Sequence, residues 1–327
     1  MQNGDRKIGL KAVTDAREDR ARKKMPRVSG TVWLGLAGAV IVTIIVSWLV
    51  ADSKVGNARD ALLAQQRAAV ETVGKEWFPL RDRLESLTID AAKGEYKGDL
   101  VSDEMKKWDF RTVPGLYLRL RVAEAKDAKT LRDKARDALK DQFAVSLLRE
   151  PLPDQLAKGE GNDAGVFGPE QPWNLRQAYA STRVLTPEWA DEVKDSTDSI
   201  RLRVFEQQYE KAKRDEIPLA IDIVKRAQFY LLVLDEDVPE AAELTDGGRI
   251  TEEALQQVGH PTRVHVFNLK TGAEIVRLRR TVEAGFVFAG ERVVVDPEIR
   301  AAMKRQVNNH ALAQEVWAAL KDAGARP

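Results

Sequence analysis

Residues 31–51 read TVWLGLAGAVIVTIIVSWLVA, and this stretch decides how the rest of the chain is organised. It lies within a run, residues 28–51, that has no charged side chain. At 1.5 Å per residue, 21 residues form a helix of about 31 Å, close to the roughly 30 Å thickness of a hydrocarbon layer. Eleven of the 21 residues are Val, Leu or Ile, which favour insertion. Because soluble core helices rarely run this long without a charge, the sequence predicts a single N-terminal transmembrane helix over 31–51.

The charges on either side of this stretch predict its orientation. Arg22, Lys23, Lys24 and Arg27 precede it, whereas residues 52–67 carry three basic and two acidic side chains. Basic residues collect on the cytoplasmic side of a span. We therefore expect residues 1–30 to form a short basic cytoplasmic tail and the C-terminal domain to be periplasmic, in a bacterial inner membrane. The apolar run exceeds the roughly 7–15 residues of a cleaved signal peptide, so an uncleaved signal-anchor is expected.

Composition excludes several functions for the region beyond the span. Residues 1–27 carry a net charge of +5 and residues 28–327 a net charge of −4, although the whole chain is +1. A mildly acidic region lacks the basic face that nucleic acid requires, so no nucleic-acid partner is expected. The chain contains no cysteine, which excludes disulfides, thiolate catalysis and iron–sulfur clusters. It also lacks any Asn-x-Ser/Thr glycosylation site.

Residues 52–95 form a predicted juxtamembrane helical segment. Apolar residues recur there at spacings of three and four, and Pro79 should kink or divide the helix. This stripe is interpreted as one helix docking on its own domain, with a homodimer seam as the alternative. A homodimer through the small residues Gly35 and Ala39 of the span is a weaker possibility. The stripe consists of Val70, Val73, Trp77, Leu80, Leu84 and Leu87.

Residues 96–327 are predicted to form an α+β soluble region, either as one domain or as two domains divided near 150–173. In 115–122, Leu116, Leu118, Leu120 and Val122 alternate with polar residues, as in a half-buried strand. An exposed helix is expected over 124–141, with Leu131, Ala135, Ala138 and Leu139 inward, and a second strand over 143–148. Four prolines and four glycines in 150–173 predict a long loop.

Helices are expected to follow this loop. Thr186 and Pro187 form a helix start, as N-cap and first helical residue. A longer helix over 197–215 should end before Pro218, and a shorter one should cover 219–226. The inward residues of the longer helix are predicted to be Ile200, Val204, Tyr209 and Ala212.

The last third is predicted to build most of the sheet. An apolar strand over 229–234 precedes a short helix over 251–258 and a hairpin of 263–267 with 274–279, whose faces include Val264, Val266 and Ile275. Residues 293–295 are expected to add an edge. A final helix should run from 296 to 321. Its stripe is Ile299, Met303, Val307, Leu312, Val316 and Leu320.

The chemistry-bearing residues form no recognised catalytic, cofactor-binding or metal-binding pattern. His260, His265 and His310 have no partner at metal-ligand spacing, and His265 is expected to point outward. Only His260 merits testing in a triad. Acidic residues follow the strand over 229–234, where α/β folds place cation sites, but they are interpreted as a solvated loop. They are Asp235, Glu236, Asp237, Glu240, Glu243 and Asp246.

These observations predict a single-pass membrane-anchored accessory, scaffolding or binding protein of the bacterial cell envelope. Its partners would be the lipid bilayer and an envelope protein. One alternative is a membrane-anchored small-molecule sensor that binds its ligand beneath 150–173, which requires an apolar pocket with a few polar groups. A third reading is an envelope enzyme with a metal at 235–246. The scaffold reading predicts an exposed apolar patch without a deep pocket.

Overall fold

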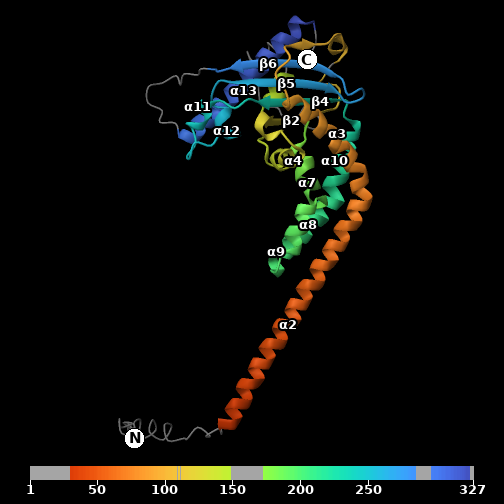
Figure 1. Cartoon of the computed structure of the whole chain (residues 1–327), viewed down its shortest axis with the longest axis vertical. Helices are drawn as coiled ribbons and strands as arrows, with labels where there is room; N and C mark the ends of the chain where they lie inside the picture. Colours follow the sequence, from red (N-terminus) through yellow and green to blue (C-terminus); the bar gives the residue numbers. More distant parts are fainter. Residues whose placement is uncertain (1–29, 109, 111, 149–171, 285–295, 325–327) are drawn as a thin grey trace, which may run out of the picture. The chain divides into compact units, whose positions relative to one another are not determined.

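The computed structural model describes residues 30–108, 110, 112–148, 172–284 and 296–324 (Figure 1). Within its first helix, side chains are described at 38–43 and from 54 onward. The chain divides into two compact units, Met1–Asp60 and Ala61–Pro327. Each unit is treated separately.

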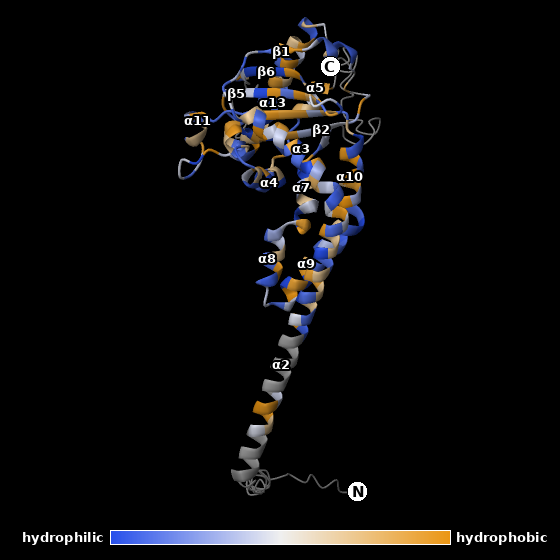
Figure 2. Ribbon diagram, turned by 45° about the vertical axis from the view of Figure 1, so that its right-hand side comes forward, coloured by the Kyte–Doolittle hydropathy of each residue, from blue (hydrophilic) through white to orange (hydrophobic). Residues whose placement is uncertain are grey.

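The first unit contains most of helix α2 (Gly30–Ala69). Its described side chains include Val40, Ile41 and Val42, which are 50%, 56% and 59% exposed. Figure 2 shows a hydrophobic stretch in this part of α2. Among the described residues, no helix is both long and apolar enough to cross a membrane. The predicted tail, and most side chains of the predicted span over 31–51, lie outside the described residues.

The second unit is built on an open, mixed six-stranded sheet with the order β1-β6-β5-β4-β2-β3 (Figure 1). β2 runs parallel to β3 and β4, and the other neighbouring pairs are antiparallel. A mixed helix-and-strand region, as expected, is therefore confirmed. The predicted strands over 115–122 and 229–234 and the hairpin are all present. The strands are β1 (Leu100–Val101), β2 (Gly115–Arg121), β3 (Trp173–Asn174), β4 (Phe229–Asp235), β5 (His260–Asn268) and β6 (Glu274–Val282).

Helices cover both faces of the sheet. On one face, α5 (Phe143–Leu148) and α13 (Pro297–Asp322) enclose the main apolar core with residues of β2, β4, β5 and β6. On the other face, α4 (Ala128–Asp137) packs on β2, and Thr88 of α3 (Lys75–Ala92) hydrogen bonds to Tyr230 of β4 at 2.8 Å. β2 is therefore buried on both faces and not half-buried as predicted. Tyr117 and Arg119 are nearly as buried as the leucines with which they alternate in β2.

A second group of helices packs beside the C-terminal part of α2. It contains α7 (Arg176–Thr182), α8 (Pro187–Lys194), α9 (Ser199–Lys211) and α10 (Ile217–Arg226). The ring of Trp189 packs 5.8 Å from Phe205 and 6.1 Å from Tyr209, whose hydroxyl donates to Gln65 O at 2.8 Å. Thr186 caps α8 by accepting from Trp189 N at 3.3 Å, with Pro187 in its first turn, as predicted.

Helix α3 docks on its own unit. Trp77 is 1% exposed, and its ring meets Tyr179 of α7 edge-on at 6.3 Å. Leu84 is also buried. The interruption predicted at Pro79 occurs earlier, as a π-helical turn over Val70–Gly74, and Pro79 lies inside α3. A second π-helical turn, Ala212–Glu216, precedes Pro218.

Several other predicted elements are present in the structure but are shorter than expected. The exposed helix is α4, with Leu131, Ala135 and Ala138 buried. The short helix over 251–258 is α12 (Glu252–Leu255), capped by Thr251. It follows the short helix α11 (Pro239–Ala242). The predicted loop and the predicted edge at 293–295 lie outside the described residues, apart from Pro172 and from Trp173, which belongs to β3.

Three further predictions are wrong. Residues 143–148 form helix α5 and not a strand, because Asp141 accepts from Phe143 N at 3.3 Å and the helix packs on α13. In α9, Ile200 and Val204 are 71% and 45% exposed, since Leu202 and Phe205 face inward instead.

The third correction concerns the stripe of α13. Its C-terminal half is buried on the sheet, with Leu312, Val316 and Leu320 at 4% exposure or less. Ile299 and Met303, in the N-terminal half, are 56% and 40% exposed. The stripe therefore marks a docked face only where α13 overlies the sheet.

Candidate functional site: a buried arginine network at the carboxyl edge of the sheet

The densest polar cluster lies where the parallel strands β2 and β4 end side by side. The chain leaves β2 for β3 on one side and returns in β4 on the other, so the strand order reverses here. Ligands of open α/β sheets bind outside the carboxyl ends of strands at such a switch point. Arg119 of β2 and Asp235 of β4 occupy this position, on the face that α13 covers.

Arg119 is the centre of the cluster and is fully engaged. Its side chain is 1% exposed. Nε donates to Asp235 Oδ2 at 2.7 Å and Nη2 to Asp235 Oδ1 at 3.0 Å, which makes a bidentate pair. Nη1 donates to Asp141 Oδ2 at 2.9 Å and to Asn309 Oδ1 at 2.6 Å. One guanidinium therefore joins β2, β4, the start of α5 and α13.

Asp235 connects the neighbouring strand β5 to the same cluster. Its Oδ1 accepts from Thr262 Oγ1 at 2.9 Å and lies 3.0 Å from His260 Nε2. Burial opposes ionisation of Asp235, but the charge of Arg119 and the hydrogen bond from His260 outweigh it. The pKa of Asp235 is therefore held well below its ordinary range, and the carboxylate is ionised at neutral pH.

An outer ring of polar groups completes the cluster. Tyr117 donates its hydroxyl to Asp141 at 2.8 Å, and burial together with the Asp141 charge raises the Tyr117 pKa well above its usual value. On the α13 side, Asn309 Nδ2 donates to Gln256 Oε1 at 3.1 Å. The space left between Arg119, Gln256 and their neighbours holds about 10 Å³ for the centre of a water molecule, which is room for about one water.

The acidic residues from Asp235 to Asp246 form only in part the solvated loop that the sequence predicts. Asp235 pairs with Arg119, Glu236 with Arg263 and Arg279, and Asp237 with Arg121. Asp237, Glu240, Glu243 and Asp246 are exposed. Among the described residues, no group of three or more His, Asp or Glu side chains is placed to hold a metal ion. The geometry therefore gives the enzyme reading no metal site in this part of the chain.

The three histidines lie in three different environments. His260 is engaged by Asp235 and by Val258 O, at 3.0 Å each. His265 does not point outward as predicted: it is 3% exposed, contacts Glu274 Oε1 through Nδ1 at 2.6 Å and stacks on Phe267. His310 is exposed on α13.

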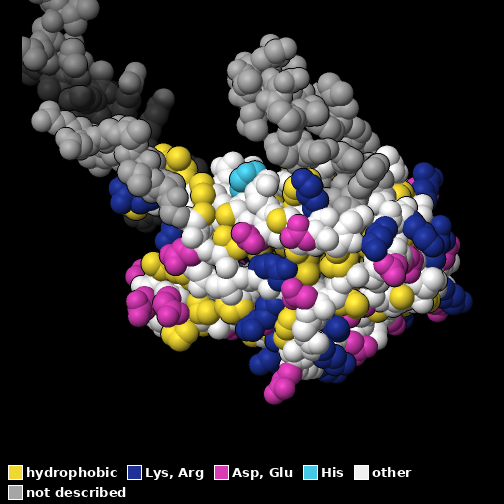
Figure 3. All heavy atoms as spheres, turned by 90° about the horizontal axis from the view of Figure 1, so that it is seen from above, with side chains coloured by type: hydrophobic (Ala, Val, Ile, Leu, Met, Phe, Trp, Pro, Cys, Tyr) yellow, Lys and Arg dark blue, Asp and Glu magenta, His cyan; other side chains and the backbone are white. Residues whose placement is uncertain are grey.

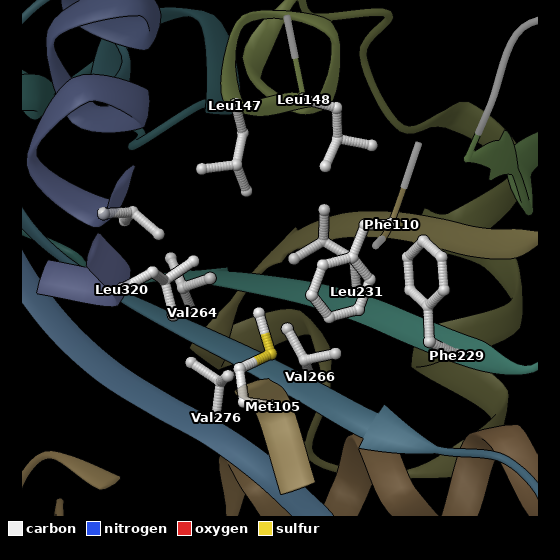
Figure 4. Close-up of a pocket in the computed structure, with 11 residues that line it drawn as sticks. Met105, Phe110, Leu147, Leu148, Phe229, Leu231, Val264, Val266, Val276 and Leu320 are labelled. Atoms are coloured by element: carbon white, nitrogen blue, oxygen red, sulfur yellow. The ribbon is translucent and has the colours of Figure 1, made fainter. Parts of the chain in front are cut away.

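A second, apolar cavity lies in the core between the sheet and the helices α5 and α13 (Figure 4). Side chains of both layers point into it, among them Leu147, Leu231, Val264 and Leu320. It has about 10 Å³ for the centre of a water molecule, and no polar side chain lines it among the described residues. Ligand pockets occupy about 300–1,000 Å³ and include polar groups, so this cavity is a packing gap and not a sensor pocket.

The surface of the second unit carries mixed charges and scattered apolar side chains. On the face shown in Figure 3, basic and acidic side chains are interspersed, and the described residues form no broad basic field. The most exposed large apolar side chain is Ile200 of α9, with Val204 one turn away. Leu219 of α10 is 55% exposed. These side chains are individually exposed on α9 and α10.

In comparison with known proteins, no family model, curated protein or solved structure matches this chain. The function of this chain is therefore inferred from its sequence and its geometry alone. Arg119 and its partners Asp141 and Asn309 were missed by sequence reasoning. The one signal that pointed to them was an arginine in the middle of an apolar strand.

Proposed function

We propose that this chain is a single-pass accessory or scaffolding protein of a bacterial cell envelope, anchored in the inner membrane and acting through residues 52–327. The observation that carries the proposal is the uncharged run 28–51, preceded by a segment of net charge +5. The exposure of Val40, Ile41 and Val42 on α2 supports it, because apolar side chains on all sides of a helix suit a lipid environment.

The second unit favours binding over catalysis. The guanidinium, carboxylate and imidazole groups at the switch point are buried and paired with one another. The two cavities have room for about one water each. A buried network of this kind fixes strands and helices in one arrangement. We therefore assign the Arg119 cluster a positioning role and place the contact with protein partners on the outer helices.

Topology is tested by reporters at the C-terminus of the full-length protein. Alkaline phosphatase, which requires the periplasm to fold, should be active there, and a green fluorescent reporter should be dark. A variant with Arg22, Lys23, Lys24 and Arg27 replaced by Gln should weaken this preference, because basic flanks set orientation. The matched control replaces Lys54, Arg59 and Arg67 and should strengthen it. A cytoplasmic C-terminus would overturn the proposed localisation.

Partner binding is tested by photo-cross-linking in native membranes. A photoreactive residue at Ile200 or Val204 should capture an envelope protein in a discrete adduct. The control position is Leu244, which is 52% exposed but lies outside the α8–α10 helices. Equal labelling from all three positions, or no adduct at all, would contradict the scaffold proposal.

A further inference from the structure

Residues 237–258 form a small clip that covers the carboxyl edge of β2 and β4. The clip contains α11 and α12. Its own core has only three buried residues, Ala241, Ala254 and Leu255, with a few half-buried neighbours. A segment with so few buried apolar contacts opens at a lower free energy than the sheet on which it rests.

Polar contacts hold the clip in place from three sides. From β2, Arg121 Nη1 donates to Ile250 O at 2.8 Å. From the segment before α5, Leu139 N donates to Glu252 Oε2 at 3.2 Å. From α13, Asn308 Nδ2 donates to Gln256 O at 2.9 Å. Two acidic side chains of the clip take part in its anchoring: Asp237, which pairs with Arg121 at 3.3 Å, and Glu252 at the start of α12.

Glu252 carries an unsatisfied buried oxygen. Its Oε2 has the contact with Leu139, but Oε1 is sealed from solvent and has no hydrogen-bond partner among the described residues. A buried carboxylate oxygen without a donor is costly, whereas a protonated carboxyl is tolerated much better. The geometry therefore favours the neutral form of Glu252.

The charges around Glu252 do not supply the missing counter-ion. Arg119 is the nearest cation with an effect on it, but Asp235 and Asp141 already bind this guanidinium. Burial raises the pKa of Glu252 to about 8, and the two aspartates act in the same direction, against Arg119 and the Leu139 N–H. The charged or titratable groups facing this corner are Arg119 and Arg121 of β2, Asp141 before α5, Asp235 of β4 and His260 of β5.

We propose that Glu252 makes residues 237–258 a pH-sensitive clip, closed while its carboxyl group is protonated and released when that group ionises. Opening would let the carboxylate reach water and would uncover the Arg119–Asp235 edge of the sheet. The proposal concerns a conformational device of the second unit and does not depend on membrane anchoring or on a protein partner.

The direction of the effect follows from linkage. In the open clip Glu252 has the ordinary value of 4.5, and in the closed clip a value of about 8. Because the closed-state pKa is raised, the closed form is favoured at low pH and loses stability as the pH rises between these two values. Within that window, the equilibrium constant for opening should rise about tenfold per pH unit and level off above pH 8.

Hydrogen exchange of the full-length protein between pH 5.5 and 8.5 tests the clip. The reporters are the amides of Leu255 and Gln256, which donate to Thr251 O at 3.0 Å and Glu252 O at 3.1 Å. After correction for the intrinsic pH dependence of exchange, their protection should fall about tenfold per pH unit up to pH 8. Amides of β4, such as that of Val233, should stay far more strongly protected than the clip amides at every pH, because the clip opens without global unfolding.

Two variants separate Glu252 from other titrating groups. Glu252→Gln should abolish the pH dependence, because the amide cannot ionise. Glu253→Gln, at the exposed neighbouring position on the same helix, should behave like wild type. A flat profile in the wild-type protein, or an unchanged slope in a folded Glu252→Gln variant, would overturn the proposal. If Glu252→Gln does not fold, Glu252→Asp decides: it should keep the slope, and a flat Glu252→Asp profile would overturn the proposal.

Discussion

Replacing Arg119 by Met tests whether the buried network holds the second unit together. The substitution keeps a side chain of similar length but removes the charge, so Asp235 and Asp141 remain buried without their cation. Removing one partner of a buried ion pair costs about 3–5 kcal/mol, because the other charge is left uncompensated. We therefore expect the free energy of unfolding to fall by about this amount at pH 7. Urea unfolding of the full-length protein in detergent, followed by near-UV circular dichroism, measures it.

The pH dependence of this loss distinguishes electrostatics from packing. The pKa of Asp235 is depressed below its ordinary 3.8 in the folded protein. The stability that its pairing contributes is therefore present above that value and is lost as the pH falls through the folded-state pKa. The gap between wild type and Arg119→Met should narrow in acid, where the carboxyl groups of the variant take up protons.

A control variant removes both charges of the bidentate pair. Arg119→Met combined with Asp235→Leu should recover part of the loss, since apolar replacement of a whole buried pair is often neutral. Asp141 would still have Tyr117 as a donor at 2.8 Å. A cost below about 1 kcal/mol for Arg119→Met, within the range of surface pairs, would refute the reasoning.

Three further substitutions test other parts of the chain. Trp77→Ala should lower the free energy of unfolding by about 3–5 kcal/mol, because Trp77 is 1% exposed against Tyr179; a cost below 1 kcal/mol in urea unfolding would contradict its docking. Gly115→Ala should cost about 1–3 kcal/mol in the same assay, since a Cβ there would lie 2.1 Å from Phe229 Cζ; a neutral result would contradict this close approach. Ile41→Arg should make the protein extractable by alkaline carbonate, because one central Arg opposes insertion by about 2.5–3.5 kcal/mol; equal retention of Ile41→Arg and wild type would argue against a span centred there.

Local pattern was sufficient to predict much of the sheet. Strict alternation identified β2, and the apolar run before Asp235 identified β4, because each signal reports the environment of a single strand. Residues 143–148 show where this fails. Five apolar residues out of six fit a buried strand or a short helix equally well, and packing on α13 decides in favour of the helix.

The candidate site was far less predictable, because its members come from distant parts of the chain. Arg119 is separated by 116 residues from Asp235 and by 190 from Asn309. Without the fold, Asp235 is indistinguishable from Glu240, an exposed acid of the same run. Which acid is buried depends on which strand lies next to it: Arg119 of β2 pairs with Asp235, the last residue of β4, whereas Glu240 lies beyond the strand on α11.

The two prolines that mark predicted breaks show how packing overrides a local rule. Proline lacks an N–H and crowds the carbonyl four residues earlier, so a helix should end there. Instead, Pro79 and Pro218 each follow a π-helical turn, which inserts one residue and lets the helix continue. The two π turns lie between the same two contacts: Tyr209 with Gln65 O, and the ion pair of Lys225 with Glu76 at 2.6 Å.

These two contacts pair the two helical stretches in the same chain direction. Each stretch therefore has its inserted residue between the two contacts, where the helices pack together. Beyond the insertions, Trp77 of α3 and Ile217 of α10 are each 1% exposed. Burying a large apolar side chain is worth about 1.5–3 kcal/mol, comparable to the roughly 3 kcal/mol that an interior proline costs. Burial at each site therefore offsets the proline, which explains why each helix continues through its widened turn.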